Sequence, residues 1–110
     1  MPSKTRPYRE FLLERLANPE VATAYVSAAL EDSQASFLKA VKNVAQAREM
    51  ASVARQAGVQ RETLYRSLSE DGNPTLATLT SILNALDMKI TITSVVRTQA
   101  DVEPQSAVQA

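Results

Sequence analysis

A chain of 110 residues has the length of one domain and can bury a core without covalent staples. It contains no Cys and no His, which excludes disulfides, thiolate metal sites and the usual general base of an enzyme. Twelve basic and twelve acidic side chains balance to a net charge of zero, which at first argues against a nucleic-acid partner. We expect no catalytic residue, no metal site and no cofactor.

The basic side chains gather in the middle third of the chain. Residues 34–68 hold six basic and two acidic residues, a net charge of +4, whereas residues 69–110 carry a net charge of −3. This distribution is compatible with duplex DNA and equally with a solvated helix face. No apolar run is long enough to span a membrane, and none follows the basic N-terminus as in a signal peptide. We therefore expect a cytoplasmic protein.

The apolar periodicity predicts a mainly α fold: a five- or six-helix domain with one C-terminal β-strand. Residues 1–7 are polar with two Pro, and we expect a flexible N-terminus there, followed by a single domain over residues 8–96. Helices are predicted at residues 8–16, 19–30, 34–48, 50–58 and 60–68, with a last helix beginning at Asn73-Pro74. Asn18-Pro19 and Asn73-Pro74 are helix-start signals, because Asn caps free N–H groups and Pro suits the first helical position.

After Asp87 the apolar period changes from helical to alternating. Residues 88–96 are rich in β-branched side chains and predict a strand. A lone strand leaves its backbone groups unpaired, and the sequence offers no second strand of similar quality. The partner is therefore expected to be a second chain, either a copy of this one or another protein; an extended tail lying across helices is the alternative. Residues 97–110 are polar and are expected to be disordered.

Residues 50–68 have the pattern of a helix-turn-helix. This motif needs a small residue where two short helices touch and a Gly in the turn between them. Ala54 and Gly58 supply both, because Gly readily takes the left-handed backbone that ends the first helix. The predicted inner face consists of Val53, Ala57, Val59, Leu64 and Leu68.

The second helix of this motif leaves polar side chains on its outside. Arg can bond guanine in a bidentate way, Gln can bond adenine, and Glu can accept from cytosine. A plain helical bundle also has a polar outer face, so polarity alone decides little. Ser52 and Arg55 on the first helix and Asn73 beyond the second are further candidates. The predicted DNA-binding residues are Ser52, Arg55, Gln60, Arg61, Glu62, Thr63, Tyr65, Arg66 and Asn73.

The segment over residues 37–90 resembles the antidote proteins of bacterial toxin–antitoxin modules, most closely the HigA-like group with a phage-repressor (Xre/Cro-like) helix-turn-helix. Two residues depart from that pattern: Glu49 stands where a Gly is expected, and Gln60 stands where Ser is usual. They predict a less sharp end to the preceding helix and a weaker cap on the second helix. The matching pieces are Phe37 to Ala45, Val53-Ala54, Ala57-Gly58-Val59, Arg61, Leu64-Tyr65, Leu68-Ser69, Gly72-Asn73-Pro74 and Leu83 to Leu86.

The resemblance implies a type II antitoxin with two activities. One is to bind and neutralise a RelE/HigB-like ribonuclease toxin. The other is to repress its own operon by binding double-stranded operator DNA. We further hypothesise that the chain binds DNA as a homodimer, for which the predicted strand over residues 88–96 is a candidate contact. For the toxin contact, the first helix carries more apolar area than one stripe requires, although core packing is the alternative for Leu12. The candidate toxin-binding residues are Tyr8, Phe11, Leu12 and Leu13.

Three other functions are weighed against this interpretation. A stand-alone helix-turn-helix repressor without a toxin partner would have the same DNA-binding half. A pure protein-interaction module would keep the helices but bind no DNA. An enzyme is disfavoured, because RelE-like ribonucleases without His still need a sheet to position their catalytic groups, and only one strand is predicted here.

Overall fold

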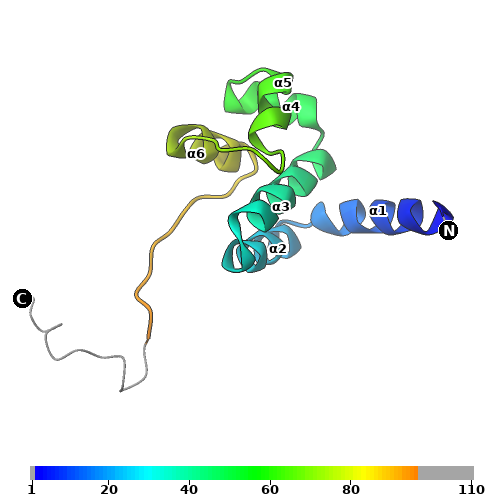
Figure 1. Ribbon diagram of the computed structural model, residues 1–110, viewed down its shortest axis with the longest axis horizontal. Coiled ribbons are helices and arrows are strands. Elements are labelled where there is room, and N and C mark those ends of the chain that lie inside the picture. The colour runs from blue at the N-terminus through cyan, green and yellow to red at the C-terminus, as the bar shows by residue number, and fades with distance from the viewer. Residues whose placement is uncertain (1, 97–110) are drawn as a thin grey trace, which may run out of the picture.

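The computed structural model describes the backbone of residues 2–96 and the side chains of residues 7–96. These residues form a mainly α fold without β-strands, which confirms the predicted helical class (Figure 1). Residues 97–110, predicted to be disordered, lie outside the described residues. The helices are α1 Pro2–Leu16, α2 Pro19–Asp32, α3 Gln34–Ala47, α4 Met50–Ala57, α5 Arg61–Ser67 and α6 Leu76–Ala85.

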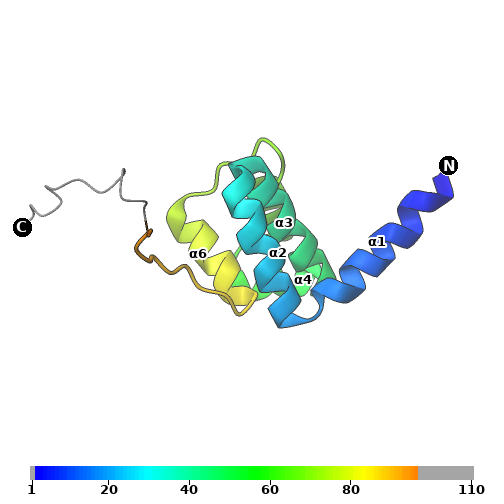
Figure 2. The ribbon, with the colours of Figure 1, turned by 90° about the horizontal axis from the view of Figure 1, so that it is seen from below.

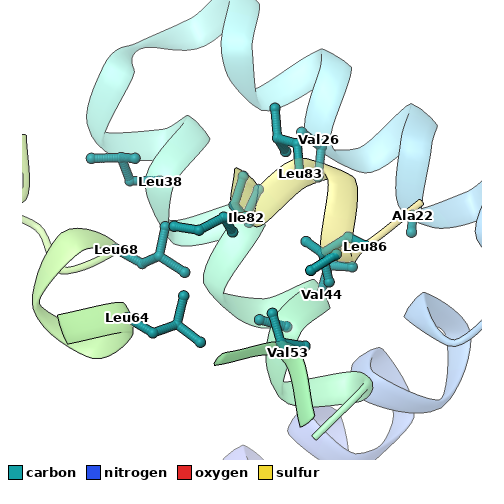
Figure 3. Close-up of a cluster of buried hydrophobic side chains, with 14 of the residues drawn as sticks. Ala22, Val26, Leu38, Val44, Val53, Leu64, Leu68, Ile82, Leu83 and Leu86 are labelled. Atoms are coloured by element: carbon teal, nitrogen blue, oxygen red, sulfur yellow. The ribbon is translucent and has the colours of Figure 1, made fainter. Parts of the chain in front are cut away.

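Helix α3 lies at the centre of the core. Its Val41 and Val44 are fully buried, and α2 packs along its side (Figure 2). Leu64 and Leu68 point into the same core, toward Ile82 of α6 (Figure 3). All three of these side chains are also buried, so the short helix α5 is held to the body by its inner face.

The helix starts follow capping chemistry, with one shift from the prediction. Asn18 caps α2, as expected: its side-chain oxygen accepts the N–H of Glu20 at 2.9 Å, and Pro19 opens the helix. The last helix was expected to start at Asn73-Pro74, but its cap is Thr75, whose hydroxyl accepts the N–H of Thr78 at 3.1 Å. Thr is also a preferred capping residue. Asn73 is therefore left in the loop between α5 and α6.

The N-terminal segment differs from the predicted flexible stretch. Helix α1 begins at Pro2, so residues 2–7 continue the helix that was expected to start at Tyr8. A Pro at the first helical position is favourable, because its missing N–H would have no partner there. Helix α1 projects from the rest of the molecule (Figures 1 and 2).

A polar network fixes the root of α1. Asn43 of α3 is buried; its side-chain oxygen accepts a hydrogen bond from Arg9 at 3.1 Å, and its N–H₂ group donates to the Tyr25 hydroxyl at 2.8 Å. Arg9 also donates to Gln46 on α3. Satisfying a buried amide in this way avoids a desolvation penalty of about 1–3 kcal/mol. The network therefore joins α1, α2 and α3 at one point.

The junction between α3 and α4 contains a strained residue. Glu49 has φ +76° and ψ 110°, a backbone conformation that side chains with a Cβ rarely adopt. The sequence pattern expected Gly here and predicted a less sharp helix end. Instead α3 ends at Ala47, and Glu49 takes the strain of the turn.

We expect Glu49→Gly to raise the free energy of unfolding by about 1 kcal/mol, because relief of strain exceeds the extra chain entropy of Gly. For a chain of this size that corresponds to a rise in Tm of about 4–8 °C, measurable by circular dichroism. Ala28→Gly, at an exposed position within α2, is the control and should lower Tm by a similar amount. An unchanged or lower Tm for Glu49→Gly would show that the backbone at Glu49 is not strained.

The predicted strand over residues 88–96 is not formed. The segment runs away from α6 without regular structure (Figure 1), and Ile92 is 92% exposed. The physical reason is that a strand exists only in a ladder with a partner, and residues 2–87 supply helices and loops. The sequence of this segment has the alternation of a strand, but a single chain provides no second strand to pair with its backbone N–H and C=O groups.

Candidate nucleic-acid interface

Helices α4 and α5 are joined by a tight turn at Gly58. Gly58 has φ +75° and ψ 28°, and its N–H donates to the Arg55 carbonyl at 3.2 Å. The next N–H, from Val59, donates to the Ala54 carbonyl at 3.0 Å. Ala54 and Leu64 are buried where the sequence predicted an inner face. The left-handed turn thus directs α5 across the body with one side inward.

The outer side of α5 carries most of the predicted DNA-binding residues. Arg61, Glu62 and Arg66 are exposed, whereas Thr63 and Tyr65 are half-buried. Gln60 precedes the helix, is exposed and makes no side-chain cap hydrogen bond, in keeping with its weaker capping chemistry. The side-chain amide of Gln60 therefore makes no hydrogen bond to the start of α5.

The structure brings some of these residues together and leaves others apart. Gln60, Arg61, Glu62 and Tyr65 line one shallow depression at the start of α5. Arg66 and Asn73 line another, where the chain turns from α5 toward α6. Ser52 and Arg55 lie on α4 and line neither depression.

Two cations lie close to the Tyr65 ring. The Lys42 Nζ lies 5.6 Å from the centroid of its ring, and the Arg61 guanidinium carbon lies 5.9 Å from it. Such contacts contribute about 0.5–1 kcal/mol at exposed sites and orient the groups involved. Sequence reasoning did not select Lys42. The available signal was its place on the basic side of α3, opposite the apolar stripe.

The candidate toxin-binding residues divide into two groups on α1. Tyr8 and Phe11 are exposed, with the Arg15 guanidinium carbon 5.8 Å from the Phe11 ring centroid. Leu12 and Leu13 are half-buried, and Leu12 packs against the core, as the alternative interpretation expected. The exposed side of α1 therefore offers aromatic surface that the core does not use.

In the described part of the chain, no helix combines the length and apolar character needed to cross a bilayer. Among residues 2–96, no three Cys, His, Asp or Glu side chains are close enough together to hold a metal ion.

Comparison with known proteins gives two matches. The family model of the probable addiction module antidote proteins matches residues 9–94. An uncharacterized protein of Haemophilus influenzae is 37% identical over 90 residues, which cover 80% of this chain and 93% of that protein. No solved structure matches significantly. Since the family model spans α2 to α6 and most of α1, the chain belongs to the probable addiction module antidote family.

Proposed function

We propose that this antidote neutralises a RelE/HigB-like ribonuclease toxin and represses its own operon, binding operator DNA through a helix-turn-helix formed by α4 and α5. Both activities are binding events and need no catalysis and no cofactor. Family membership supports a toxin partner in general. The observation that carries the DNA-binding half is the exposed polar face of α5, held outward by buried Leu64.

The DNA-binding half follows from shape and charge. An α-helix fits the major groove, and side chains such as Arg61, Glu62 and Gln60 can bond base edges there. The basic middle third favours phosphates despite a net charge of zero. A homodimer would set two α5 helices about 34 Å apart, one turn of DNA, on a pseudo-palindromic operator. The segment over residues 88–96 supplies an unpaired edge for that dimer.

We expect Arg61→Ala and Arg66→Ala to weaken operator binding, each by about 1–3 kcal/mol if it removes a bidentate base contact. Loss of a base contact relaxes specificity at one position, whereas loss of a phosphate contact weakens all sequences and flattens the salt dependence. Fluorescence anisotropy with operator and scrambled duplexes over a salt series separates these roles.

The control for this series is Arg15→Ala, which removes the same charge from α1, away from α5. Arg15→Ala should leave the affinity and the salt slope unchanged. If Arg61→Ala and Arg66→Ala behave like Arg15→Ala, α5 is not the recognition helix.

The toxin-binding half is assigned to the exposed side of α1. Tyr8 and Phe11 are exposed aromatic side chains, the type that anchors protein interfaces. We expect the double substitution Tyr8→Asp, Phe11→Asp to abolish co-purification with the proposed RelE/HigB-like toxin, sought among the products of the neighbouring genes, while the helical circular dichroism spectrum is retained.

Leu76→Asp is the matched control, because Leu76 is another exposed apolar residue but lies on α6. Unchanged toxin binding by the double variant would end the assignment of α1. If no neighbouring toxin binds the native chain at all, the stand-alone repressor replaces the antidote proposal.

A further inference from the structure

The segment over residues 88–96 has a fixed root. The Met88 N–H donates to the Leu83 carbonyl at 2.8 Å, and the Asp87 carboxylate forms a 3.2 Å ion pair with Arg48. Arg48 also donates to the Leu86 carbonyl at 3.4 Å. The direction in which the chain leaves α6 is therefore determined by contacts with the body.

The outer end of the segment is uncovered. Ile92 and Val96 are almost entirely exposed and Val95 is largely exposed, although large β-branched side chains favour buried strands. The backbone N–H and C=O groups of residues 89–96 form no hydrogen bond with the rest of the described chain. An unpaired edge with exposed apolar side chains is a template for pairing with another strand.

An apolar groove begins beside the root of the segment. Its floor is formed by Val26, Phe37 and Leu83, from α2, α3 and α6. Leu30 lies at its rim and is 57% exposed. Ile90, from the segment itself, also lines the groove, so the unpaired edge and the groove form one continuous surface.

We propose that a second copy of this chain covers this surface, with the two segments over residues 88–96 paired as antiparallel strands about a two-fold axis near Thr91. The outer end of each segment then lies beside the root of the other and covers its groove. This proposal rests on the proposed operator binding in one respect. A palindromic operator requires a protein with two-fold symmetry, and this dimer provides it.

The sequence of the segment is complementary to itself in this arrangement. With the axis at Thr91, Ile90 of one copy lies opposite Ile92 of the other, a favourable pair of β-branched side chains. Lys89 is the only charged residue of the segment, and it lies opposite Thr93 rather than opposite another Lys. Pairing gives hydrogen-bond partners to the exposed backbone N–H and C=O groups and covers the apolar side chains at the same time.

The test is the oligomeric state of the full chain by sedimentation equilibrium, without DNA or toxin. We expect the native chain to be a dimer at about 100 µM, and Ile92→Lys to weaken association roughly 100-fold, because two buried Ile side chains are lost per dimer. Ile92 is remote from the core, so the melting temperature of the variant should match that of the dissociated native chain. Leu76→Lys, also on exposed apolar surface, should remain a dimer.

A second pair of variants tests the groove. Leu30→Glu should weaken association, whereas Leu76→Glu should not, because Leu76 does not line the groove. The chain has no Cys, so Thr91→Cys introduces a single thiol that should form a disulfide-linked dimer on oxidation. Asn84→Cys, at an exposed position on α6, should not.

A monomeric native chain at that concentration would overturn the proposal, as would a dimer that survives both Ile92→Lys and Leu30→Glu. A monomer that loses toxin binding on Ile92→Lys would assign the segment to the toxin instead. None of these oligomer measurements involves DNA. Failure to bind an operator would therefore contradict the proposed function without bearing on the dimer.

Discussion

Replacing Leu64 by Ala is expected to lower the free energy of unfolding by about 3 kcal/mol, because it removes a fully buried side chain and leaves a cavity. Leu64 is also the only buried residue within α5. The loss therefore falls on the packing of this short helix against the buried core. Urea denaturation followed by circular dichroism measures the effect.

Operator binding should be affected more than toxin binding in the same variant. Once α5 is loosened, it must be ordered again before it can enter a groove, whereas α1 is fixed separately by the Asn43 network. Leu76→Ala is the control: Leu76 is 70% exposed, and its loss should change stability by less than about 0.5 kcal/mol. Equal stability of the two variants would mean that α5 is not held by Leu64.

Replacing Gly72 by Ala is expected to be about as damaging, near 3 kcal/mol, for a different reason. A Cβ at this position would lie 2.1 Å from the Ser67 carbonyl oxygen and 2.9 Å from that of Ser69. Both atoms belong to the backbone and cannot rotate away. The turn after α5 must then open, which displaces Asn73 and weakens the packing of α6.

Gly58→Ala provides the comparison within the same chain. Nothing lies within 4 Å of a Cβ at Gly58, so the cost there comes only from its φ of +75°. That cost is about 1 kcal/mol. Thermal unfolding of the two variants should therefore show a clearly larger fall in Tm for Gly72→Ala. The reverse order would show that the turn after α5 adapts more easily than its geometry indicates.

Features set by local sequence were predictable in this protein. The inner face of α4 and α5 follows from helical spacing, because Val53 and Ala57, and likewise Leu64 and Leu68, are four residues apart and face the core. The left-handed turn at Gly58 follows from the chemistry of a residue without a Cβ. The exposure of Arg61 and Arg66 is then a consequence of burying the opposite side of the same helix.

Features that depend on distant partners were not predictable. The strand over residues 88–96 was expected from its alternation, but strand formation needs a second edge that alternation cannot provide. Lys42 was not selected from the sequence, because its position over Tyr65 depends on how α3 and α5 pack. The same holds for Asn43, whose partners on α1 and α2 are 34 and 18 residues away in sequence.

The way in which α1 is attached has a consequence for how this protein can diversify. Buried Leu16 and the bonds of Arg9 fix only one end of the helix, and Tyr8 and Phe11 contribute nothing to the shared interior. Mutations at those two positions can accumulate without loss of folding. If the proposed toxin contact lies on α1 and the proposed operator contact on α5, a lineage can change its toxin partner while it keeps its operator, because substitutions on one surface leave the other intact.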